Sequence, residues 1–179
     1  MIARAAGGRS HPPVERWTPP FCGDLDMEID RDGRWHYLGS PIGREALVRL
    51  FAGVLKREGD AYFLVTPVEK VGIRVADAPF MAVEMHVEGA EADRRITFRT
   101  NVGDVVEADP DHPLRFAMAS DGGLLPYVHV RRGLEARLTR PLLHEIADLI
   151  EPRPGDGRLG VFAGGVFHLL PEDAMDAGT

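Results

Sequence analysis

The residues best suited to chemistry in this chain are cationic side chains that could hold an anion. Ser40 and Pro41 resemble a helix start, because serine caps free N–H groups and proline lacks an N–H that would be unpaired there. Arg44 would then lie one turn inside the helix, and helix N-termini attract anions. Ser40 and Arg44 are therefore a candidate phosphate-binding site, although a plain cap beside a solvent-facing arginine is the favoured interpretation.

A second set of candidates would meet only if the chain folds into two units with a cleft between them. His129 and Arg131 share one face of a predicted strand and could meet an anion. The ordinary surface charge of strands explains this set equally well. The remaining candidates, which would face one another across the cleft, are Glu69, Lys70, Arg99, Asn101 and Arg115.

Catalytic and metal-binding patterns are weak throughout the sequence. The glycines at 155, 157 and 160 match a dinucleotide-binding pattern, but a helix precedes them and a strand follows, which reverses the required context. No serine lies in a G-x-S-x-G elbow, and no histidine pair has zinc-ligand spacing. We therefore predict no catalytic residue, no metal site and no cofactor.

Composition limits the partners and the compartment. The net charge of −7 disfavours nucleic acid, because phosphate contacts need a surplus of cations. The single cysteine, Cys22, permits no internal disulfide and favours a reducing cytoplasm. No apolar run is long enough to span a bilayer. We expect a cytoplasmic protein without a membrane span.

The elements that must position the candidate residues occur in the same order twice. Apolar periodicity predicts two strands, a helix and two strands over residues 25–75, and the same order over residues 127–170. The two helices would cover residues 41–55 and 140–150. The strands predicted between the two copies are residues 80–87, 95–100, 105–108 and 114–119.

This pattern predicts an α+β fold of duplicated ββαββ units, with mostly antiparallel sheets that each pack against one helix. A duplicated unit creates a pseudo-symmetric pair with a cleft between its members, where a ligand would lie. The expected divisions are a flexible N-terminal arm at residues 1–20, an N-terminal unit at 21–78, a C-terminal unit at 79–171 and a tail at 172–179.

Several separate motifs of the chain occur in the order of one known family. They include CGDLDMEIDRDGRWHYLGSPIGREALVRLFAGVL, YFLVTPVEKVGIRV, DAPF, TNVGD, HPLR, PYVHVRRGLEARL and GVFAGGVFHL. The chain thereby resembles an uncharacterised bacterial family, domain of unknown function 1285. The resemblance implies two related α/β units, of which the C-terminal one is superficially similar to pleckstrin-homology-like domains. It also implies a nucleotide-like ligand at the domain interface and a place in signalling.

The sequence leaves three hypotheses for the function. The favoured one is a regulatory protein that binds a small anionic, nucleotide-like ligand between its two units. The alternative is a hydrolase or transferase that acts on a phosphorylated small molecule. A third is a protein-interaction module, with a protein partner or a second copy of the chain on its exposed sheet edges.

Overall fold

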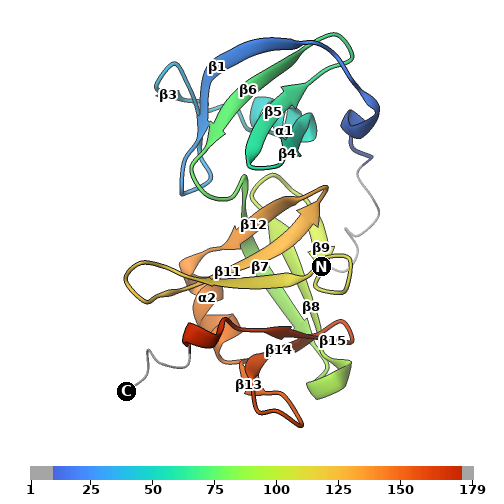
Figure 1. Ribbon diagram of the computed structural model, residues 1–179, viewed down its shortest axis with the longest axis vertical. Coiled ribbons are helices and arrows are strands. Elements are labelled where there is room, and N and C mark those ends of the chain that lie inside the picture. The colour runs from blue at the N-terminus through green and yellow to red at the C-terminus, as the bar shows by residue number, and fades with distance from the viewer. Residues whose placement is uncertain (1–9, 175–179) are drawn as a thin grey trace.

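The computed structural model describes residues 10–174, which form two units stacked along the long axis of the molecule (Figure 1). The N-terminal unit is one six-stranded sheet of order β3-β2-β1-β6-β5-β4, in which only β1 and β6 pair in parallel. Its elements are η2 (Val14–Arg16), β1 (Phe21–Ile29), β2 (Trp35–Tyr37), β3 (Ser40–Pro41), α1 (Glu45–Gly53), β4 (Leu55–Glu58), β5 (Ala61–Val65) and β6 (Lys70–Val75).

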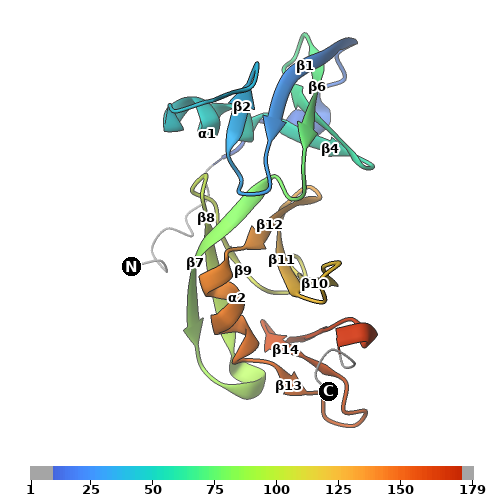
Figure 2. The same cartoon turned by 90° about the vertical axis from the view of Figure 1, so that its left-hand side faces the viewer.

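Helix α1 covers one face of this sheet, the rear face in the view of Figure 1, as the side view in Figure 2 also shows. Strand β1 alternates, so that Met27 and Ile29 are buried on this side while Asp26 and Glu28, which alternate with them, lie on the opposite face. Trp35 of β2 stacks on Phe51 of α1 with ring centroids 6.0 Å apart. Burial of each large apolar side chain contributes roughly 1.5–3 kcal/mol, and this helix–sheet contact holds the unit together.

The C-terminal unit contains a second six-stranded sheet and one helix, followed by a three-stranded sheet. The orders are β10-β11-β12-β7-β8-β9 and β13-β14-β15, and β12 pairs with β7 in parallel. Its elements are β7 (Phe80–Glu88), η3 (Glu91–Asp93), β8 (Arg95–Thr100), β9 (Val105–Glu107), β10 (Leu114–Met118), β11 (Leu124–Arg131), β12 (Leu134–Leu138), α2 (Arg140–Ala147), β13 (Glu151–Pro152), β14 (Leu159–Ala163) and β15 (Val166–Leu169).

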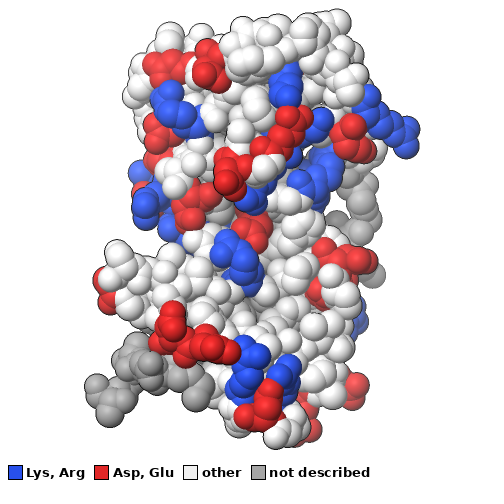
Figure 3. All heavy atoms as spheres, in the orientation of Figure 1, with Lys and Arg blue, Asp and Glu red and all other residues white. Residues whose placement is uncertain are grey.

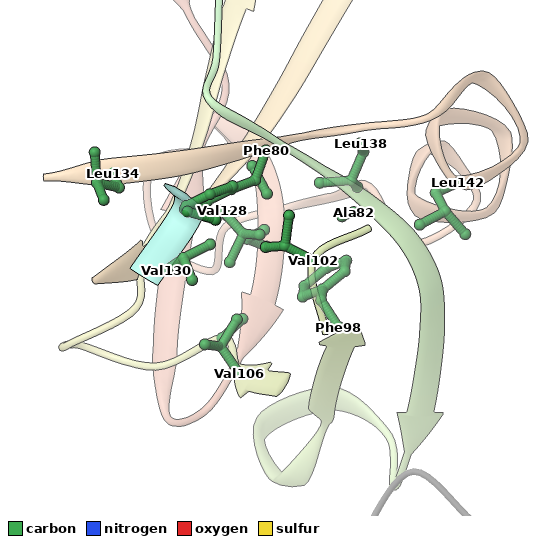
Figure 4. Packing of buried hydrophobic residues seen from close by; sticks show 14 of the residues in the cluster. Phe80, Ala82, Phe98, Val102, Val106, Val128, Val130, Leu134, Leu138 and Leu142 are labelled. Atoms are coloured by element: carbon green, nitrogen blue, oxygen red, sulfur yellow. The ribbon is translucent and has the colours of Figure 1, made fainter. Parts of the chain in front are cut away.

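The core of the C-terminal unit forms where the concave sheet meets α2. Phe80, Phe98 and Leu134 are completely buried, and Leu142 of α2 packs into the same cluster (Figure 4). The helix begins after Thr139 with a proline in its first turn, as the sequence predicts.

The predicted α+β fold with duplicated units is confirmed, and the second copy differs from the first in one respect. In the first copy the strands that follow the helix, β4 to β6, rejoin the sheet that contains β1 and β2. In the second copy the strands that follow α2 pair only with one another, as a separate three-stranded sheet. The order of elements is therefore repeated, while the strand pairing is not.

The predicted start of the first helix is wrong. Ser40 and Pro41 pair with Tyr37 and His36 as strand β3, so Ser40 is extended and does not cap a helix. The cause is a tight turn at Leu38 and Gly39, whose φ angles of 50° and 78° fold the chain back at once. Helix α1 begins at Glu45 with Arg44 in the N-cap position, and it ends at Gly53, after which Leu55 begins β4.

The described part of the predicted N-terminal arm is held against the body. Val14 is completely buried, and Arg132 donates a 2.9 Å hydrogen bond to the carbonyl of Pro12. Residues 1–9 of the arm and 175–179 of the tail lie outside the described residues. Within residues 10–174, none of the helices has the length and apolar character needed to cross a bilayer.

Candidate functional site

The two units meet along a seam, defined here by the hydrogen bonds that cross between residues 31–57 and residues 101–137. Most of the donors are arginine side chains that reach a backbone carbonyl of the other unit. A guanidinium carries five N–H donors in a fixed plane, so it can bond a carbonyl across the seam and a carboxylate nearby. The three arginine bonds are Arg57 to Gly133 (3.0 Å), Arg131 to Ala52 (2.8 Å) and Arg137 to Arg31 (2.6 Å).

Asn101 joins the seam at the hairpin between β1 and β2. Its amide donates a 3.3 Å hydrogen bond to the carbonyl of Gly33, and its Oδ1 accepts the N–H of Met81 at 3.0 Å. Gly33 has a φ of 77°, and an added Cβ would overlap the Met81 side chain. This position therefore needs glycine both for the turn and for the close approach of the two units.

Asp77, in the connection between the units, accepts two further hydrogen bonds. Arg137 donates to one carboxylate oxygen at 3.1 Å, and the hydroxyl of Tyr127 donates to the other at 2.8 Å. Burial and this hydrogen bond raise the pKa of Tyr127 to about 12. The guanidinium of Arg115 lies 4.1 Å from the centre of the Tyr127 ring. These contacts fix the connection against the C-terminal sheet.

Arg131 forms a buried ion pair with Asp104 at 2.5 Å, with side chains 12% and 8% exposed. The guanidinium also lies 4.9 Å from the Phe80 ring centre, and its Nε has no hydrogen-bond partner among the described residues. Asp104 also accepts a 2.7 Å hydrogen bond from His11. Burial and the charge of Arg131 lower the pKa of His11, and Asp104 offsets only part of this shift. This cluster ties the described start of the chain to the seam.

Beside the contact between Arg137 and the β1–β2 hairpin, the seam opens into a groove of about 530 Å³, called here the seam groove. In Figure 2 the β1–β2 hairpin lies above the end of β12 and the start of α2. Residues of both segments line the groove. Half-buried leucines of β11 and α2 form an apolar wall. The lining residues are Asp32, Arg34, Met81, Leu124, Leu125, Pro126, Arg137, Leu138, Thr139, Arg140 and Leu143.

The seam groove contains two arginines whose charge is little compensated. Arg140, exposed at the start of α2, forms no ion pair with any residue between 10 and 174. Arg34 of the N-terminal unit lies 3.9 Å from Asp32, and both side chains are about 70% exposed, so this pair is loose. Thr139 makes no side-chain capping bond, which leaves the first N–H groups of α2 without a side-chain acceptor.

Most of the cationic candidates from the sequence are already neutralised by a carboxylate of their own unit. Figure 3 shows the result as basic and acidic side chains intermixed over one face of the molecule. The pairs are Lys70 with Glu58 at 2.6 Å, Arg99 with Glu84, and Arg115 with Glu135 at 2.8 Å. These arginines and this lysine therefore have little free charge to offer a ligand.

The structure does not bring Glu69 and Lys70 to face the second unit. The hairpin at residues 66–69 lies at the end of the N-terminal unit that is remote from the C-terminal unit (Figure 1). His129 accepts the N–H of Gly133 at 3.0 Å and donates to the carbonyl of Asp111 at 3.0 Å, so both ring nitrogens are used by the local turns. Asn101 and Arg131 do lie at the seam.

Sequence reasoning missed Arg34 and Arg140 as candidates for the site. Each had a local signal: Arg34 follows the turn at Asp32-Gly33, and Arg140 stands between the capping position Thr139 and a helix-starting proline. Ser40 and Arg44 are exposed and are not among the residues that line the seam groove. The phosphate seat expected at Ser40 and Arg44 lacks the helix turn on which it depended.

Fold and groove define a protein of two related α+β units with a ligand-sized opening at their junction. Comparison of the sequence with models of known protein families identifies the family of this chain. Residues 12–78 match the model of the DUF1285 N-terminal domain, and residues 79–170 match that of the DUF1285 C-terminal domain, both described as of unknown function. The chain belongs to the DUF1285 family. No curated protein matches it.

Two solved structures are similar to this chain. The crystal structure of a DUF1285 family protein from Silicibacter pomeroyi DSS-3 is 48% identical, with a TM-score of 0.87 over 97% of this chain and 95% of that chain. A DUF1285 family protein from Shewanella baltica OS155 is 28% identical, with a TM-score of 0.56 over 69% of this chain and 91% of that chain. The fold described above is thus that of the family.

Proposed function

We propose that this protein is a regulatory protein that binds a small anionic, nucleotide-like ligand in the seam groove. The observation that carries the proposal is that Arg34 and Arg140, from different units, line the same groove. Arg34 is only loosely paired with Asp32 at 3.9 Å, and Arg140 has no ion-pair partner among residues 10–174. A guanidinium binds phosphate oxygens with two parallel hydrogen bonds. An anion between the two arginines would therefore be attracted by both units at once.

The other walls of the groove fit the rest of a nucleotide. Leu124, Leu125 and Leu143 offer apolar surface on which a flat ring could pack. The start of α2 has no side-chain cap and carries the positive end of the helix dipole, which adds to the attraction for an anion. A groove of about 530 Å³ is within the size range of small-molecule sites.

A ligand in this position would act on the arrangement of the units. It would contact the β1–β2 hairpin on one side and the start of α2 on the other, so it would stabilise the contact between the two units. Such a coupling is what a signalling role requires, because occupancy changes the stability or the geometry of a surface that a partner can recognise.

The fold likeness of the C-terminal unit, the cellular compartment and the alternative functions are further parts of the proposal. Likeness of the C-terminal unit to pleckstrin-homology-like domains is supported by its mostly antiparallel sheet and the helix α2 that packs on it. The exposed thiol of Cys22, which is in no disulfide, fits a cytoplasmic setting. A phosphate-transferring or hydrolysing activity, a protein partner and self-association remain predictions from the sequence.

The proposal is tested by a thermal-shift screen with inorganic phosphate, nucleoside monophosphates and cyclic dinucleotides. A ligand at 100 times its Kd stabilises the folded state by about 2.7 kcal/mol, which raises Tm measurably. We expect a dose-dependent rise that is lost in Arg34→Gln and Arg140→Gln and kept in Arg44→Gln, which removes an exposed charge outside the groove. A flat screen, or a rise that survives both groove substitutions, would contradict the proposal.

A further inference from the structure

A second opening lies on the face of the N-terminal sheet that is turned away from α1. It is a hollow of about 560 Å³, called here the outer hollow, on the face that the upper part of Figure 3 turns to the viewer. Three adjacent strands supply its walls, since Asp24 of β1 and Phe63 of β5 both pair with Gly72 of β6. The residues used in the argument are Phe21, Asp24, Phe63, Lys70, Gly72 and Arg74.

Gly72 forms the floor of the outer hollow, where a side chain would not fit. Its φ lies outside the left-handed region, so the extended backbone at this position would accept any residue. An added Cβ would overlap the carboxylate of Asp24, which lies across the glycine. Glycine weakens a strand interior, and at this position it leaves room above the sheet for Asp24 and for a ligand.

The charges around the hollow leave one carboxylate without a partner. Lys70 is paired with Glu58 at 2.6 Å, and Arg74 is paired with Asp26 at 2.8 Å. The side-chain carboxylate of Asp24 forms no hydrogen bond or ion pair with any residue from 10 to 174. The uncompensated charge in the middle of the hollow is therefore negative, and it favours a cation.

Aromatic rings next to Asp24 make the hollow suitable for an organic cation. Phe21 and Phe63 meet edge to face with centroids 6.0 Å apart, and Phe21 is 56% exposed. The ammonium of Lys70 already lies 4.3 Å from the centre of the Phe63 ring. Lys70 thus already makes one ammonium–ring contact in the hollow, and the exposed ring of Phe21 lies beside the free carboxylate of Asp24.

We propose that the outer hollow binds a small organic ammonium ion with an apolar body. The ammonium group pairs with Asp24, and the apolar body packs on the exposed ring of Phe21. An inorganic cation is strongly hydrated and has no apolar body to pack on the rings, and the uncompensated carboxylate would repel an anion. The site is separate from the seam groove and stands independently of the function proposed for that groove.

The test is a ¹H–¹⁵N correlation titration of the full-length protein with three probes of nearly equal shape: benzylamine, benzyl alcohol and benzoate. We expect benzylamine to shift the amide signals of residues 21–24 and 70–74 in a saturable way. The neutral alcohol and the anionic benzoate should shift the same signals several-fold less at equal concentration. Equal shifts from benzyl alcohol or benzoate would overturn the proposal, and so would the absence of any benzylamine shift in these segments.

A charge-removing variant separates specific pairing from general attraction to an acidic protein. Asp24→Asn should weaken benzylamine binding by about fivefold, the order expected for one solvent-exposed ion pair. Asp148→Asn, which removes an exposed carboxylate of the C-terminal unit, should leave the binding unchanged. Because Asp24 is exposed, the variant should fold, and the spectrum itself reports this. Equal effects of both substitutions would overturn the assignment of Asp24.

Discussion

The contact between the two units can be tested at a single glycine. Gly33 and Gly39 have nearly the same backbone conformation, with φ angles of 77° and 78°. An added Cβ at Gly33 would overlap Met81 and lie 3.2 Å from the amide of Asn101, whereas at Gly39 it would meet nothing within 4 Å. Alanine at the two positions therefore imposes the same backbone strain but a different steric cost.

The expected magnitudes follow from these two terms. A left-handed conformation costs a residue with a Cβ about 1–2 kcal/mol, and this cost applies to both Gly33→Ala and Gly39→Ala. Overpacking at a tight contact adds about 1–3 kcal/mol, and this cost applies only at Gly33. Gly33→Ala should therefore reduce the free energy of unfolding by about 1–3 kcal/mol more than Gly39→Ala.

Urea unfolding followed by circular dichroism measures both variants under the same conditions. An unchanged m value would show that the two losses can be compared directly. If Gly33→Ala and Gly39→Ala lose the same stability, then Gly33 does not lie in a close contact between the units, and the seam as described is incorrect.

Two further predictions concern buried ionisable groups. Asp104→Asn should lower the free energy of unfolding, measured in urea, by about 3 kcal/mol because it leaves Arg131 buried without its counter-ion. Glu135→Gln removes one partner of a more exposed pair and should lower it by less than about 1 kcal/mol. Equal losses in the two variants would refute the buried ion pair. Burial lowers the pKa of His168, so the unfolded chain binds the proton more readily and stability should fall as pH drops below 6.5. This loss, measured between pH 6.5 and 5, should be smaller in His168→Gln and unchanged in His144→Gln; identical pH profiles would refute the assignment.

The parts of the fold that the sequence predicted have strong local signals. The alternation in β1 and the proline-marked start of α2 depend on side-chain periodicity and on caps, which are properties of neighbouring residues. The hairpin at Leu38 and Gly39 escaped prediction because leucine is an unusual residue in a left-handed turn position. Without a turn at these two residues, Ser40-Pro41 matches the pattern of a helix start.

The candidate site was harder to predict because charge compensation depends on strand register. Arg99 lies directly opposite Glu84 on the neighbouring strand, and a shift of one residue would have separated them. Sequence alone could not show that Arg99 was neutralised while Arg140 was not. The seam groove likewise depends on how the two units stack, which no local pattern specifies.

The central claim is that an anion bound between the units contacts both of them. The most direct measurement is a ¹H–¹⁵N correlation titration with AMP, read at the amides of residues 32–34 and 139–143. The proposal predicts that signals of both segments shift together with a single Kd, and that Arg140→Gln weakens binding as seen from either segment. Shifts confined to one segment, or found only elsewhere in the protein, would contradict it.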